Sequence, residues 1–76
     1  MEINSFIEKF AEQLEKVKVT DLKPETKFRD IEEWSSLMAL SIIAMVDEEY
    51  EVIIKGEDIR NSKTINDLFE VVKSRL

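Results

Sequence analysis

Apolar residues recur at helical spacing in three stretches of this chain, and this pattern constrains the fold most strongly. One glycine and one proline leave few turn residues for a many-stranded β fold. The first stretch has charged residues between its apolar positions and predicts an amphipathic helix over residues 3–18. Its apolar residues are Ile3, Phe6, Ile7, Phe10, Leu14 and Val17. We therefore predict an all-α fold.

A long connection follows this first helix. Pro24 forbids simple continuation of the helix. A connection over residues 19–35 is unusually long for a compact domain unless it packs on the core. We expect four separated apolar residues to pin it there: Leu22, Phe28, Ile31 and Trp34. A short helical turn is predicted within residues 28–33.

The second main helix is predicted from Ser36 to Tyr50, with Ser35 as its N-cap. Its core stripe is Ala39, Ile42, Ile43, Val46 and Tyr50. The other apolar residues, expected at the rim or outside, are Leu37, Met38, Leu40, Ala44 and Met45. This is too much apolar surface for a helix that buries one face. Either the helix is buried on several sides, or some of these residues form an exposed patch for a partner.

Two further helical segments complete the chain. In the extended connector over residues 51–54 we expect Val52 or Ile54 to point inward, and Gly56 permits the turn into a short helix over residues 57–60. Thr64 and Asp67 form a variant of the capping box that starts the last helix. Its stripe is Ile65, Leu68, Phe69, Val72 and Leu76. The prediction is one domain over residues 1–76, a small four-helix bundle with three main helices and one short helix.

The residue types that are missing exclude several kinds of site. The 76 residues contain no cysteine, so there is no disulfide framework and no thiolate metal site. They contain no histidine, the commonest general base and neutral metal ligand. We therefore expect neither a catalytic site nor a metal. No signal-peptide pattern and no apolar run of about 20 residues is present, which predicts a cytoplasmic protein without a membrane span.

Negative charge is concentrated in the middle of the sequence. Residues 30–58 contain nine acids and one base, a net charge of −8, whereas the whole chain has a net charge of −6. This charge argues against nucleic acid as a partner, because its backbone requires lysine and arginine. The acidic segment is either a solvated helix face or a docking surface for basic partners.

The order of these features resembles the acyl carrier protein family, whose small members hold intermediates on a phosphopantetheine arm. The family has Asp-Ser-Leu at the start of its second helix, and Ser35-Ser36-Leu37 stands at that place here. The resemblance covers nearly the whole chain. Further matching segments are Asp47-Glu48-Glu49 with Tyr50, Val52-Ile53-Ile54, Glu57-Asp58 and Lys63-Thr64-Ile65.

The resemblance implies that Ser36 carries covalently attached 4'-phosphopantetheine, whose thiol holds acyl groups as thioesters. At the start of a helix, the free N–H groups and the helix dipole favour such a phosphate. The implied partners are a phosphopantetheinyl transferase and acyl synthases or transferases of fatty-acid, lipid or polyketide-type synthesis. Their basic patches would dock on Leu37, Leu40, Ala44, Asp47 and Glu48. We expect a monomer that is not itself an enzyme.

Position 35 departs from the family pattern, because Ser replaces the usual Asp. Ser caps a helix about as well as Asp, but the lost charge could matter for recognition by a transferase. Ser35 is also a second hydroxyl beside Ser36, and Leu37 sets the register in favour of Ser36. The absence of a Gly-rich sequence before the serine favours an acyl over an aminoacyl carrier.

Two questions about the surroundings of Ser36 stay open at this point. Trp34 either anchors the loop on the core or shapes the surface around the arm. If an acyl cavity exists, its candidate lining residues are Phe6, Ile43, Val46, Ile54, Ile59, Phe69 and Val72. The alternative function, from a different class, is an unmodified helical interaction module that docks basic partners through its acidic second-helix face.

Overall fold

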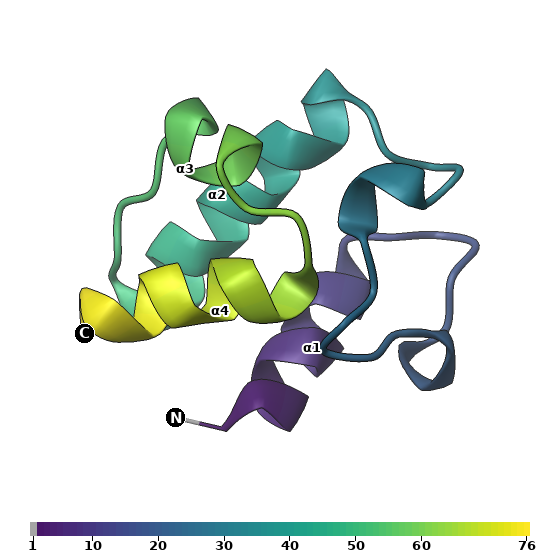
Figure 1. Cartoon of the computed structure of the whole chain (residues 1–76), viewed down its shortest axis with the longest axis horizontal. Coiled ribbons are helices and arrows are strands. Elements are labelled where there is room, and N and C mark those ends of the chain that lie inside the picture. The colour runs from purple at the N-terminus through teal and green to yellow at the C-terminus, as the bar shows by residue number, and fades with distance from the viewer. Residues whose placement is uncertain (1) are drawn as a thin grey trace.

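Four α-helices and two short 3₁₀ helices make up the computed structural model, which describes residues 2–76 (Figure 1). The α-helices are α1 (Ile3–Glu12), α2 (Ser36–Tyr50), α3 (Gly56–Arg60) and α4 (Ile65–Ser74). The 3₁₀ helices in the α1–α2 connection are η1 (Val19–Asp21) and η2 (Phe28–Asp30). Within residues 2–76 there is no strand, only an isolated bridge between Lys27 and Thr64. The predicted all-α four-helix bundle is confirmed.

The core lies where the main helices meet. α1 contacts α2 and α4, and α3 contacts α2 and α4. In Figure 1, α4 lies on the viewer's side of α2, and the long α1–α2 connection loops out to the right of α1. Apolar side chains that are almost completely buried come from α1, α2 and α4, and also from η2 and the α2–α3 connector. These are Phe6, Phe10, Phe28, Ile42, Val46, Ile54, Ile65, Leu68 and Val72.

The long connection is pinned to the core as predicted. Leu22 and Phe28 are buried, and Ile31 and Trp34 are half-buried against the core. The start of α4 holds the connection as well, since Ile65 N–H donates to the Thr26 carbonyl at 3.0 Å. A helix start leaves such N–H groups without partners inside the helix. The connection therefore supplies a hydrogen-bond acceptor for the start of α4, and the same bond holds the connection in place.

The first helix ends at Glu12, and the prediction that it continues to residue 18 was wrong. The backbone N–H of Glu15 donates to both carboxylate oxygens of Glu33, at 3.1 and 2.9 Å, and the N–H of Lys16 donates to the same carboxylate. These amides would otherwise continue the helical ladder. A charged acceptor forms a stronger hydrogen bond than a carbonyl, so Glu33 draws the chain out of the helix.

Two further expectations need correction. Met45, expected at the rim or outside, is buried with 4% exposure, because α2 is covered on more than one side. Leu76, expected in the apolar stripe of the last helix, is exposed because α4 stops at Ser74. The left-handed residue after α2 is Glu51, with φ 56°, and Gly56 begins α3 without a positive φ. In the connector, both Val52 and Ile54 are buried.

Candidate functional site

Two adjacent serines stand at the start of α2 and have different environments. Ser35 is extended (φ −157°, ψ 173°) and is the N-cap, as predicted, because its hydroxyl accepts the Met38 N–H at 3.2 Å. Ser36 is the first helical residue and is exposed, and within residues 2–76 its hydroxyl has no hydrogen-bond partner. Of the two hydroxyls, only that of Ser36 is therefore unengaged.

The same helix start also presents backbone donors. The first helical bond of α2 runs from Ala39 N–H to the Ser35 carbonyl at 3.0 Å. The N–H groups of Ser36 and Leu37 lie ahead of this bond and have no acceptor inside the helix. Together with the positive end of the helix dipole, they favour an anion next to the Ser36 hydroxyl.

Trp34 fixes the approach of the chain to these serines. Its ring stacks nearly parallel to Phe10, with ring centroids 6.2 Å apart, and meets Phe28 at 4.8 Å. Phe10 in turn lies 6.4 Å from Phe6, which meets Phe69 of α4 at 5.6 Å. A continuous series of aromatic contacts thus runs from α4 to the residue before Ser35. Trp34 is therefore a loop anchor, and it also lines the groove described next.

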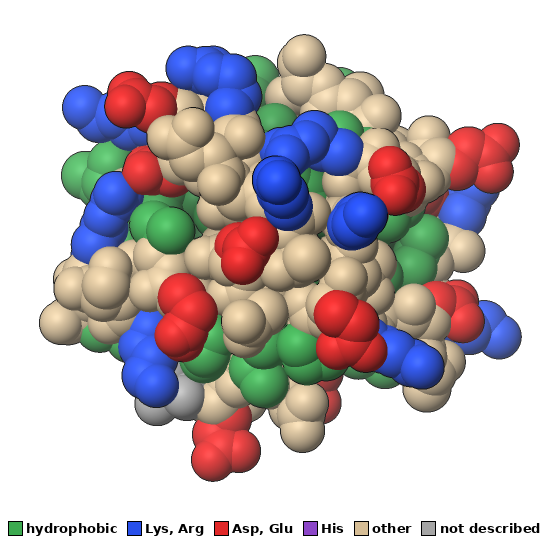
Figure 2. Space-filling view, in the orientation of Figure 1, with side chains coloured by type: hydrophobic (Ala, Val, Ile, Leu, Met, Phe, Trp, Pro, Cys, Tyr) green, Lys and Arg blue, Asp and Glu red, His purple; other side chains and the backbone are tan. Residues whose placement is uncertain are grey.

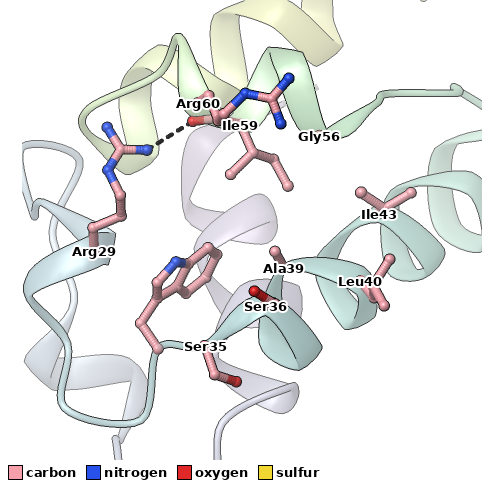
Figure 3. Close-up of a pocket in the computed structure, with 10 residues that line it drawn as sticks. Arg29, Ser35, Ser36, Ala39, Leu40, Ile43, Gly56, Ile59 and Arg60 are labelled. Atoms are coloured by element: carbon pink, nitrogen blue, oxygen red, sulfur yellow. Dashed lines mark hydrogen bonds between the residues drawn. The ribbon is translucent and has the colours of Figure 1, made fainter.

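A groove of about 520 Å³ opens beside Ser36, between the first half of α2, the η2 region and α3. Its lining residues are Arg29, Trp34, Ser35, Ser36, Ala39, Leu40, Ile43, Gly56, Ile59 and Arg60. Figure 3 shows the α2 side chains on one side and Arg29, Ile59 and Arg60 on the other. Among the residues considered for an acyl cavity, Ile43 and Ile59 line this groove. The others lie in the core: Phe6, Val46, Ile54, Phe69 and Val72.

The α3 wall of the groove is held by α4. The Arg75 guanidinium forms two hydrogen bonds with the Asp58 carboxylate, at 2.7 and 2.9 Å, and a third with the Ile53 carbonyl at 3.2 Å. Asp58 also accepts the Lys55 N–H at the start of α3, at 2.8 Å. The Arg75 side chain, and next the Lys55 amide, hold the pKa of Asp58 below its usual value. Asp58 therefore joins the start of α3 to the end of α4.

The outer face of α2 carries apolar and acidic side chains together. Leu37 is 73% and Leu40 61% exposed, and Ala44, Asp47 and Glu48 are exposed as well. Their spacing along the helix places them on one face. The next acid, Glu49, differs because it pairs with Lys9 at 3.3 Å. On the face shown in Figure 2, acidic and basic side chains are intermixed. Of the two alternatives left open by the sequence, the exposure of Leu37, Leu40 and Ala44 agrees with an apolar patch on this helix.

The fold and this helix start define a class: a small helical carrier domain with an exposed serine at the mouth of its second helix. The family model described as the phosphopantetheine attachment site matches residues 4–72. The chain therefore belongs to this family, that of the acyl carrier proteins. Domains of the family carry covalently attached 4'-phosphopantetheine and are not catalytic themselves, and the arm implies a phosphopantetheinyl transferase and acyl-handling partner enzymes.

The residues around Ser36 fit such a group, since an unengaged hydroxyl, free helix N–H groups and two guanidiniums all border the groove. Within residues 2–76, no helix has the length and apolar character needed to cross a bilayer. In the same part of the chain, no cluster of three potential ligands could hold a metal ion.

Sequence reasoning missed Arg29, Arg60 and Glu33 as parts of the site and its support. Arg29 lies one residue before and Arg60 two residues after the acidic segment of residues 30–58, so the charge count for that segment left both arginines out. Their shared position in the groove depends on how η2 and α3 pack against α2. No local pattern in the sequence signals that arrangement.

Proposed function

We propose that this chain is an acyl carrier whose 4'-phosphopantetheine arm is attached to Ser36. The observation that carries the proposal is the difference between the two serines. The Ser35 hydroxyl is committed to the Met38 N–H, whereas the Ser36 hydroxyl is exposed and unengaged at the mouth of α2. A modifying enzyme needs an accessible nucleophile, and Ser36 satisfies that need without disturbing the cap of the helix.

The chain's own residues position the arm and supply no chemistry to it. When bound, the arm provides the thiol that forms a thioester with an acyl group, which explains how a chain without cysteine or histidine takes part in thioester chemistry. The Ser36 and Leu37 N–H groups stabilise the phosphate charge at the start of α2. The transferase supplies the base that activates the hydroxyl, so none is needed next to Ser36.

The partner enzymes would dock on the outer face of α2. Leu37, Leu40 and Ala44 supply an apolar centre, and Asp47 and Glu48 supply negative charge on the same face. Apolar anchors give affinity at an interface, while complementary charge speeds the encounter and fixes its register. This face suits basic patches on a transferase and on synthases of fatty-acid, lipid or polyketide type. Residues 1–76 would act as a single, monomeric domain in the cytoplasm.

Intact-protein mass spectrometry after co-expression with a broad-specificity phosphopantetheinyl transferase tests the attachment. We expect a mass increment equal to the arm in the wild type and in Ser35→Ala, and no increment in Ser36→Ala. Ser35→Ala is the matched control, because it removes the neighbouring hydroxyl and the cap. An increment that survives in Ser36→Ala would overturn the assignment of the serine. No increment with any of several transferases would favour the unmodified interaction module.

A further inference from the structure

The groove beside Ser36 has a charge opposite to that of the protein as a whole. Its charged lining residues are Arg29 and Arg60, and no carboxylate lines it within residues 2–76, although the chain has a net charge of −6. In a surface this acidic, two guanidiniums in one groove make a local site for an anion. The guanidinium fork is well suited to phosphate and carboxylate oxygens.

Arg29 is held in place by its own contacts. Its Nη1 donates to the Ile59 carbonyl at 2.8 Å, and its guanidinium lies over the Phe28 ring at 5.1 Å from the centroid. Because the guanidinium has five N–H donors, the bond to Ile59 leaves others for a ligand. Arg29 therefore joins η2 to α3 and keeps its charge at the edge of the groove (Figure 3).

Arg60 has no comparable contacts within residues 2–76. It is exposed, and within residues 2–76 it forms neither a hydrogen bond nor an ion pair with another side chain. Its side chain folds back along α3, so that its Nη1 lies 3.3 Å from where a Cβ on Gly56 would stand. Figure 3 shows the guanidinium turned toward Gly56 over the groove. Because Gly56 has no side chain, the space beside it is open to the Arg60 guanidinium.

We propose that Arg60, assisted by Arg29, binds the phosphodiester of the chain's own prosthetic arm and holds the arm along the groove. This inference rests on the proposed attachment at Ser36. The phosphodiester is the anion of the arm that is bonded to the serine itself, and Ser36 lines the same groove as both arginines. The apolar side chains of Trp34, Ala39 and Ile43 then form the surface along which the rest of the arm lies. The resting position of the arm is thus set within the carrier.

The experiment compares the apo and arm-loaded forms of the full chain, with loading verified by intact mass. Trp34 is the single tryptophan and lines the groove, so its fluorescence reports an arm that lies there. The Arg60 Nε–H signal in ¹H–¹⁵N NMR spectra reports the phosphate contact directly. The variant is Arg60→Gln. The matched control is Lys55→Gln, which removes one positive charge beside α3 from a residue that does not line the groove.

We expect loading to shift both the Trp34 emission and the Arg60 Nε–H signal in the wild type and in Lys55→Gln. In Arg60→Gln, the ratio of groove-bound to free arm should fall about two- to fivefold, the range of an exposed ion pair. Added salt should weaken the wild-type shifts. A fully loaded wild type with an unmoved Arg60 signal, or an Arg60→Gln protein with an unchanged Trp34 shift, would overturn the inference and leave the attachment intact. Absence of the arm from Ser36 would overturn both proposals.

Discussion

The pairing of Asp58 with Arg75 gives the most direct test of how the α3 wall of the groove is held. Asp58→Ala removes three interactions at once: two hydrogen bonds from the Arg75 guanidinium and one from the Lys55 amide. Arg75→Ala removes the two bonds to Asp58 and the 3.2 Å bond to the Ile53 carbonyl, but leaves the Lys55 contact. Glu57→Ala is the control, because this exposed neighbouring acid forms no side-chain hydrogen bond within residues 2–76.

The expected loss of stability follows from these contacts. The Arg75 and Asp58 side chains are 42% and 18% exposed, so solvent screens the pair, and it contributes about 0.5–1 kcal/mol. The hydrogen bond at the start of α3 adds about 1 kcal/mol, typical of a helix cap. Asp58→Ala should therefore lower the free energy of unfolding by about 1.5–2 kcal/mol, and the Tm by about 6–16 °C in a domain of this size. Glu57→Ala should stay within about 0.5 kcal/mol of the wild type.

The cost of Asp58→Ala should also depend on pH. The folded-state pKa of Asp58 lies below its ordinary value of 3.8, so its carboxylate stabilises the fold fully above that value. The contribution is lost as the pH falls through the lowered pKa. Circular-dichroism melting curves of wild type and variant should therefore converge in acid.

A double-mutant cycle completes the test, with an expected coupling energy between Asp58 and Arg75 of about 0.5–1 kcal/mol. Two results would refute the reasoning. One is a coupling energy indistinguishable from zero. The other is a destabilisation by Asp58→Ala that is equal at about pH 7 and about pH 2, which would assign the effect to packing rather than to the ionised carboxylate.

Three further substitutions test other contacts. Glu33→Gln should lower stability in urea denaturation by about 1 kcal/mol, because its charged acceptor for the Glu15 and Lys16 amides is lost; an unchanged midpoint would contradict this role. Met45→Ala should lower the free energy of unfolding by about 2–5 kcal/mol in the same assay, because the side chain is buried. A decrease below about 0.5 kcal/mol, as expected for a surface residue, would argue against that burial. Leu40→Ala should leave stability within about 0.5 kcal/mol but slow loading by the transferase, measured by mass, and unchanged kinetics would remove Leu40 from the docking face.

The parts of the fold that sequence reasoning predicted are those that local chemistry decides. Three of these features depend on residues only a few positions apart: the Ser35 cap, the capping box of Thr64 with Asp67, and the short α3. The loop anchors Phe28 and Trp34 were found because large apolar side chains in a polar connection must be buried somewhere. Such features depend little on how the helices are arranged.

The features that sequence reasoning missed depend on contacts distant in the chain. Helix α1 ends early because the distant Glu33 carboxylate binds the Glu15 and Lys16 amides, which would otherwise extend the helix. Met45 is buried because α2 is covered on more sides than its periodicity implied. The cationic groove depends on Arg29 and Arg60, which are separated in sequence by the acidic segment. Counting charged residues along the chain gives the net charge of a segment, but the packing of the helices decides on which surface each charged side chain lies.

This separation of charge has a consequence for release of the arm. The outer face of α2, with Asp47 and Glu48, is the proposed docking face for basic partners, while the groove on the other side of Ser36 is the proposed anion site. A basic partner docked on α2 brings additional cations close to the phosphodiester that Arg60 is proposed to hold. A ligand shifts an equilibrium by its differential affinity for the two states, so a partner whose cations replace Arg60 at the phosphodiester would favour the arm leaving the groove. Docking and release are then coupled, and Arg60→Gln should reduce the dependence of arm release on the partner.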